Sequence, residues 1–157
     1  MPQLPPSGDA GKLAGMRNII ILAGLLLTSC DIIGDVSHEE RAWAASPDGR
    51  THAILIETNG GATTAFGYLV ELHPSDHQGE EPIRVADFYR VDSHCEYGLN
   101  MRWKDANTLV LGIGSAGQMH VKGSASVGGK PIRVIVQTGV NDTADPCHGM
   151  KGKLRKM

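Results

Sequence analysis

Short apolar segments separated by turn residues make up most of the chain, and their spacing indicates strands. The clearest begins at Phe66, after which Tyr68, Val70 and Leu72 recur at a period of two, as on the inward side of a half-buried strand. The continuous apolar run 53–56 is typical of a strand covered on both faces. No segment after residue 30 has the period of an amphipathic helix. Further strands are predicted at 83–91, 99–103, 108–113, 118–122 and 132–137.

A polar stretch at 104–107 separates two of these strands and predicts a hairpin. Apolar residues alternate on both sides of it, so the two sets can meet across the strand pair. These residues are Leu99, Met101 and Trp103 before the turn and Leu109, Leu111 and Ile113 after it. Strands at this spacing favour a mainly β fold, built as a single antiparallel meander, sandwich or partly open barrel.

Length and charge limit what this chain can be. It has 157 residues and a formal net charge of −2, so we expect one β domain at 43–148 and no nucleic acid among its partners. The residues at 149–157 form a short basic tail that includes Lys151, Lys153 and Arg155. We expect a solvated terminus there, with contact to anionic lipid as the alternative.

An apolar run at 19–27 follows Arg17 and ends in Leu27-Thr28-Ser29-Cys30. It has roughly half the ~20 residues of a spanning helix and the dimensions of a signal peptide. The sequence resembles the lipobox of bacterial lipoproteins, in which the cysteine thiol is diacylated, the chain is cut before it and the new amino terminus is acylated. The resemblance implies a lipid at Cys30 that holds the protein to the bacterial cell membrane, facing the periplasm or the exterior. An ordinary cleaved signal and an uncleaved anchor are the alternatives.

The same resemblance divides the amino-terminal part of the chain. The signal peptide is expected at 16–29, with Met16 as the true start, and 1–15 as a non-native or disordered extension. The segment 30–42 is expected to be a tether with a short helix near 36–41, because Ser37 can cap it and two glutamates suit its first turn. Asp31 resembles the inner-membrane retention signal of enteric lipoproteins, and the choice between inner and outer membrane stays open.

Two cysteines remain after Cys30, and they predict a disulfide. Outside the cytoplasm an even remainder favours a bridge, here between Cys95 and Cys147. The alternative is a metal site, since His94 and His148 each stand beside one cysteine. Spacing opposes it, because zinc ligands usually lie two to four residues apart, and adjacent residues of a strand point to opposite faces. No metal or other cofactor is predicted.

Three short motifs resemble a family of small bacterial proteins of unknown function. They are the turn Ser46-Pro47-Asp48-Gly49, the GATT motif at 61–64 and Trp103-Lys104-Asp105, and together they cover roughly 43–113. In that family a cysteine often precedes GATT, and Gly60 occupies that place here. The resemblance implies a β-rich exported or membrane-tethered module with no established chemistry.

The GATT motif has two interpretations. Its residues Gly61, Ala62, Thr63 and Thr64 can form a binding loop, because glycine permits close approach and two hydroxyls supply hydrogen bonds. The alternative is a bulged turn whose threonines enter a strand.

The remaining motifs do not identify an enzyme. The segment 112–117 fits GxGxxG, but 118–122 alternates like a strand, so a glycine-rich turn is expected in place of a dinucleotide site. Neither a GxSxG elbow nor a serine–histidine arrangement appears, and no catalytic residue is predicted. Asp87 falls on the apolar side of its predicted strand and is expected to point inward, where it would need a partner.

We therefore predict a lipid-anchored bacterial envelope protein that acts as a noncatalytic binding or structural module for an envelope protein partner. The first alternative is an envelope hydrolase inhibitor or immunity lipoprotein that inserts the loop 112–117 into an active site. The second is a metal or small-ligand sensor using His73, His77 or the His94/His148 pair.

Overall fold

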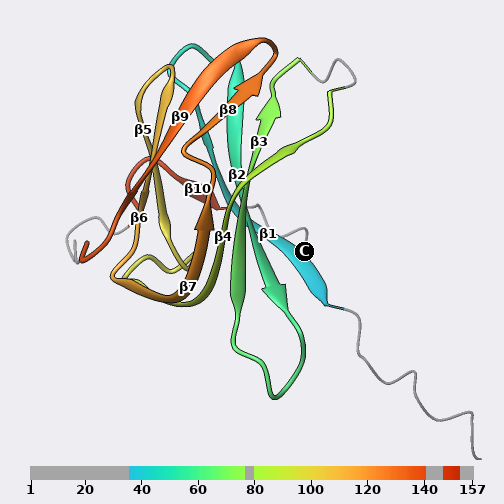
Figure 1. The fold of residues 1–157 in the computed structure, drawn as a ribbon, viewed down its shortest axis with the longest axis vertical. Coiled ribbons are helices and arrows are strands. Elements are labelled where there is room, and N and C mark those ends of the chain that lie inside the picture. The colour runs from blue at the N-terminus through green and yellow to red at the C-terminus, as the bar shows by residue number, and fades with distance from the viewer. Residues whose placement is uncertain (1–35, 77–79, 141–146, 153–157) are drawn as a thin grey trace, which may run out of the picture. The chain divides into compact units, whose positions relative to one another are not determined.

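The computed structural model describes residues 36–76, 80–140 and 147–152, which form ten strands and no helix. One sheet has six strands in the order β10-β1-β2-β3-β4-β7, and the other has four in the order β5-β6-β9-β8 (Figure 1). This confirms the mainly β fold, with two sheets that do not close into a barrel. The first sheet contains β1 (Ser37–Ala45), β2 (Thr51–Asn59), β3 (Gly67–Pro74), β4 (Ile83–Asp92), β7 (Ser115–Val121) and β10 (Lys151–Gly152). The second contains β5 (Asn100–Asp105), β6 (Thr108–Gly112), β8 (Ser124–Val127) and β9 (Lys130–Gln137).

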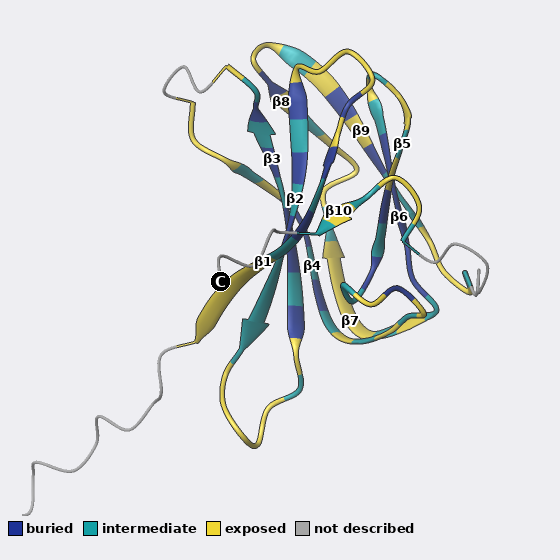
Figure 2. Cartoon of the chain, turned by 180° about the vertical axis from the view of Figure 1, so that it is seen from behind, coloured by how far each residue is buried: buried dark blue, intermediate teal, exposed yellow. Residues whose placement is uncertain are grey.

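The core lies between the two sheets, as in a β-sandwich. A single cluster of buried side chains draws on both sheets, and Figure 2 shows buried positions along strands of each sheet. From the six-stranded sheet it takes Leu55, Leu72 and Phe88, and from the four-stranded sheet Met101 and Leu111, all fully buried. The alternating pattern of the sequence thus becomes the inward face of each sheet.

The predicted hairpin at the polar stretch 104–107 is confirmed. Met101 pairs with Leu111 and Trp103 pairs with Leu109 across β5 and β6. The indole nitrogen of Trp103 also donates a hydrogen bond to the Ala44 carbonyl of β1, 3.0 Å away, and so joins the two sheets at one point.

The connectivity departs from a single meander at β7. Strands β1 to β4 form successive hairpins, but β7 returns to the first sheet and pairs with β4. The place beside β6 is then filled by β9, which runs parallel to it. Local alternation specifies strands but not these long-range pairings, so the sequence could not predict the parallel pair.

The short helix predicted near 36–41 is wrong, because the chain from Ser37 onward belongs to β1. Ser37 pairs with Asn59 and Glu40 pairs with Ile56 of β2. A ladder of interstrand hydrogen bonds outweighs a local capping preference. The β domain therefore begins before residue 43.

The predicted solvated tail also contributes to the sheet. Lys151 and Gly152 form β10 and pair with Trp43 and Ala42 of β1. The ammonium group of Lys151 lies 5.1 Å from the centre of the Trp43 ring, a cation–π geometry. Residues 153–157 of the tail lie outside the described residues.

The inward orientation predicted for Asp87 is wrong. A β-bulge shifts the register of β4 against β3 between Val70 and Glu71. Val85 and Ala86 are both buried in consequence, and the inward side then continues at Phe88. An extra residue in one strand reverses every later side chain, so Asp87 lies on the opposite face and is only half-buried.

The predicted disulfide joins Cys95, in the connection between β4 and β5, to Cys147, with Cα atoms 5.0 Å apart. The sequence separation is 52 residues, so the bridge restrains much of the unfolded chain.

We expect the double substitution Cys95→Ala/Cys147→Ala to lower the free energy of unfolding by about 4 kcal/mol, the chain-entropy value for a loop of this length. Urea unfolding at neutral pH measures it, with the wild-type chain under reductant as the matched comparison. A loss below about 1 kcal/mol would contradict the restraint that we assign to the bridge.

Candidate functional site

An open cavity of about 410 Å³ lies beside the disulfide, at the end of the four-stranded sheet. Its volume is that of a small-molecule site. Strands β5, β6 and β9 contribute residues to it, as do the segment 93–95, Val140 and His148. The described residues that line it are Ser93, His94, Cys95, Asn100, Arg102, Val110, Gly112, Gln137, Val140 and His148.

Small residues on the outer side of β6 make the floor of the cavity. Leu109 and Leu111 of this strand point into the core, so Val110 and Gly112 face outward. A Cβ atom added to Gly112 would lie 3.5 Å from Asn100 and 3.6 Å from Val140, both of which line the cavity. The absence of a side chain at this position therefore leaves part of the hollow open.

Long polar side chains from the flanking strands cross over this floor. Arg102 of β5 pairs with Val110, and Gln137 of β9 pairs with Gly112. The guanidinium of Arg102 donates a hydrogen bond to Oε1 of Gln137, 3.4 Å away. This bond spans β6 and orients the guanidinium above the cavity. Among the described residues, no carboxylate forms an ion pair with Arg102.

The described residues that line the cavity carry charge of one sign only. Among the described residues that line it, Arg102 is the permanent charge, two histidines stand beside it, and no aspartate or glutamate is present. The four strands of this sheet carry a single carboxylate, Asp105, whose Oδ1 accepts a hydrogen bond from the Asn107 backbone in the β5–β6 turn. The same strands carry Arg102, Lys104, Lys130 and Arg133.

The disulfide brings His94 and His148 to the same cavity, since each follows or precedes a bridged cysteine. The metal site built on both cysteines is therefore wrong, because their sulfurs bond to each other. Within the described part of the chain, no group of three or more histidine, cysteine or acidic residues can hold a metal ion. The position of each histidine next to a cysteine was the one sequence feature that could have predicted that His94 and His148 lie close to the same site.

The connection that carries His94 is shaped by local contacts. The Cys95 backbone N–H donates to Ser93 Oγ at 3.1 Å, and the Gly98 N–H donates to the Cys95 carbonyl at 2.9 Å. Gly98 has a φ of 105°, and a Cβ atom there would lie 2.2 Å from the Tyr68 ring. Only glycine fits this backbone against that ring.

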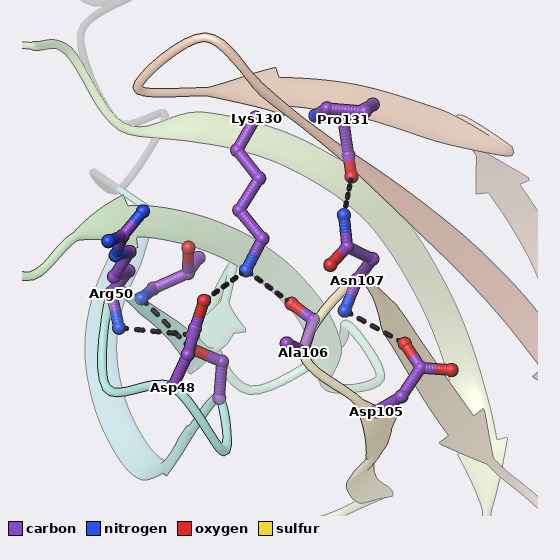
Figure 3. A network of polar contacts seen from close by, with 9 residues as sticks. Asp48, Arg50, Asp105, Ala106, Asn107, Lys130 and Pro131 are labelled. Carbon is purple, nitrogen blue, oxygen red and sulfur yellow. Dashed lines mark hydrogen bonds and ion pairs between the residues drawn. The ribbon is translucent and has the colours of Figure 1, made fainter.

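The SPDG turn has a structural explanation, which Figure 3 shows. Asp48 Oδ1 accepts hydrogen bonds from Ser46 Oγ at 2.6 Å and from the Arg50 N–H at 3.2 Å. Its other oxygen accepts a bond from Lys130, which also donates to the Ala106 carbonyl at 2.7 Å. We call Asp48, Lys130 and Ala106 the turn network, because they tie together the turns β1–β2, β8–β9 and β5–β6.

The GATT residues form the turn between β2 and β3 and are exposed. The Gly61 carbonyl accepts hydrogen bonds from the Thr64 N–H at 3.1 Å and from the Thr64 hydroxyl at 3.0 Å. The Gly61 N–H donates to Asn59 Oδ1 at 2.9 Å. Much of the polar capacity of the motif therefore closes its own turn, and its use as a binding loop stays a prediction.

The glycine-rich segment 112–117 is a crossover between the sheets. Ile113 is fully buried, the Gly114 N–H donates to the Asp92 carbonyl at 2.8 Å, and the Gly114 carbonyl accepts from Gly139 at 2.8 Å. β7 begins at Ser115, which confirms a turn followed by a strand. A segment bonded in this way gives no support to insertion into a partner's active site.

The other two histidines predicted as a sensor are His73 and His77. His73 lies on β3 with its Nε2 3.3 Å from Glu71 Oε2. His77 lies outside the described residues, as do Cys30, the lipobox and all of 1–35. Among the residues that the structure describes, no helix is long and apolar enough to span a membrane.

Comparisons with models of protein families, with curated proteins and with solved structures find no match for this chain. The resemblances to bacterial lipoproteins and to the SPDG/GATT family stay predictions.

We expect Asp48→Asn to destabilise the protein at neutral pH and to change its response to acid. The hydrogen bond from Lys130, and after it that from Ser46, lowers the pKa of Asp48 far below the ordinary 3.8. A lowered folded pKa stabilises the native state above the unfolded pKa, and this stabilisation is lost as the pH falls toward the folded pKa.

The wild-type minus variant difference in unfolding free energy is therefore expected to be constant above about pH 5 and to shrink steadily below about pH 4. Denaturant titrations across this range measure it. Asp76→Asn, at an exposed carboxylate outside the turn network, is the matched control. A difference that stays constant down to about pH 2 would contradict the linkage.

Proposed function

We propose that this protein is a lipid-anchored bacterial envelope protein and that its β domain is a noncatalytic binding module. The observation that carries the proposal is the Cys95–Cys147 disulfide. Bridges of this kind form and persist in oxidising compartments and are rare in the cytosol. The lipobox at 27–30 supplies the matching route of export.

The anchor and the domain are consistent with each other in length. The described domain begins at Val36, and the chain between Cys30 and Val36 can reach at most about 20 Å when fully extended. A lipid at Cys30 would therefore hold the domain within a short distance of the bilayer surface. Several acyl chains would make that attachment effectively permanent, because each buried methylene contributes about 0.8 kcal/mol.

The cavity beside the disulfide supports binding as the activity of the domain. It combines an apolar floor with a few convergent polar groups, the usual composition of a ligand site. His94 and His148 are next to the two bridged cysteines. The disulfide must therefore be formed for both histidines to line the cavity. We propose this cavity as the principal binding site of the module.

The first test is the intact mass of the full chain purified from membranes of a bacterial host, with and without reductant and a thiol label. We expect cleavage before Cys30, the added mass of acyl chains, and no thiol labelling until Cys95 and Cys147 are reduced. Cys30→Ala should then appear unacylated and shift from the membrane fraction to the soluble or uncleaved fraction.

A matched control is Ser29→Ala, which keeps a small residue before the cut and should leave acylation unchanged. An unacylated wild-type chain with an intact disulfide would reject the lipid anchor and keep the exported domain. Two free thiols in the native chain would reject the envelope assignment itself.

A further inference from the structure

We propose that the cavity beside the disulfide binds the oxyanion group of a small ligand, a carboxylate or a phosphate, with Arg102 as its principal contact. The proposal deepens the binding role proposed above and rests on the cavity being the binding site, but it does not depend on the lipid anchor. A carboxylate and a phosphate would use the same hydrogen-bond donors, and the experiment below distinguishes between them.

The first argument is the placement of Arg102. Its guanidinium reaches over β6 and is oriented by the hydrogen bond to Gln137, 3.4 Å away. That bond uses one of five N–H donors, so a fork of donors remains for a planar or tetrahedral anion. No carboxylate pairs with this side chain among the described residues.

The second argument is the character of the other lining groups. The Ser93 hydroxyl and the His94 imidazole can donate hydrogen bonds to an anion. Val110, which is 4% exposed, and Val140 supply an apolar wall for the remainder of the ligand. A cation would meet Arg102 with no compensating charge among the described residues of the wall.

The third argument comes from comparison with two other cavities of similar volume. A cavity of about 340 Å³ on the six-stranded sheet has Arg84 and Lys122 in its wall, but it also contains Asp87. Another of about 420 Å³ has Arg50 and Lys130, but Asp76 lies in its wall, and Lys130 is bound to Asp48 in the turn network. The cavity beside the disulfide combines a permanent cation with a described wall that lacks carboxylates.

The test is an NMR titration of the full chain, purified in detergent with its disulfide intact and labelled in histidine and arginine side chains. Acetate and inorganic phosphate are the probes, and sodium chloride at matched ionic strength is the control for screening. We expect saturable shifts of His94, His148 and Arg102 with acetate or phosphate in the millimolar range, as suits fragments of a few atoms. His38 and His120, on the six-stranded sheet, should not respond.

Two variants locate the site. Arg102→Gln removes the cation and should weaken binding at least about tenfold. Gly112→Ala adds a Cβ atom at ordinary contact distances from Asn100 and Val140, so the fold is retained while the floor is filled, and binding should weaken. Arg133→Gln, at an exposed cation of β9 outside the cavity, is the matched control and should bind within about twofold of wild type.

Equal losses in Arg102→Gln and Arg133→Gln would indicate general attraction to a basic sheet and would overturn the proposal. So would shifts that chloride reproduces, or the absence of saturation with both probes. The segment 141–146, outside the described residues, contains Asp142 and Asp145. Binding seen only after Asp142→Asn/Asp145→Asn would show that the chain's own carboxylates fill the site, and would also overturn it.

The test of the lipid anchor and the test of anion binding can fail independently of each other. Acylation of Cys30 without anion binding would keep the envelope module and reject this ligand class. Anion binding to a chain that carries no lipid would keep the ligand class and reject the anchor.

Discussion

The Cys95–Cys147 bridge is the constraint on which the carboxyl-terminal part of the structure depends. It holds the chain that follows Cys147 against the connection between β4 and β5, and a few residues later that chain becomes β10 and pairs with β1. Two residues of pairing would be marginal by themselves, so the covalent link is what makes such a short edge strand reasonable. The same link places His94 and His148 around one cavity. The disulfide therefore contributes to the stability of the domain, to the pairing of β10 with β1 and to the geometry of the candidate site.

The turn network serves the opposite end of the four-stranded sheet. β6 begins at Thr108, next to the turn that contains Ala106, and ends at Gly112 on the floor of the cavity. Lys130 ties the Ala106 turn to Asp48 of the other sheet, and Asn107 adds a hydrogen bond from its side chain to the Pro131 carbonyl at 3.0 Å. Polar contacts between turns thus surround the start of β6, whereas the cavity lies at its other end. The SPDG motif belongs to the end with these contacts, which explains its composition without a ligand.

The sequence predicts structure correctly where a local pattern or a residue count specifies it, and incorrectly where it depends on strand pairing with distant partners. The β5–β6 hairpin follows from alternation on both sides of a polar turn, and the disulfide follows from counting cysteines. β1 was mistaken for a helix because Ser37 and the glutamates satisfy a local capping rule, while its pairing with β2 is invisible in the residues themselves. Asp87 was misplaced because a one-residue bulge reverses the alternation. The cavity depends on Arg102 and Gln137, common residues in no motif, that meet only because β9 lies beside β6.

The two outer sheet faces treat charge differently, and this difference is what makes the cavity a plausible anion site in a chain of net charge −2. On the six-stranded sheet, Glu71 Oε1 lies 3.9 Å from Arg84 Nε, so opposite charges offset each other within the face. On the four-stranded sheet, Arg102 is held instead by a neutral amide. Fixed cations next to a low-dielectric wall concentrate anions locally whatever the net charge of the protein, because charges beyond about 10 Å are screened at moderate salt. The field that a small anion meets at the cavity is therefore set by Arg102 and its immediate neighbours.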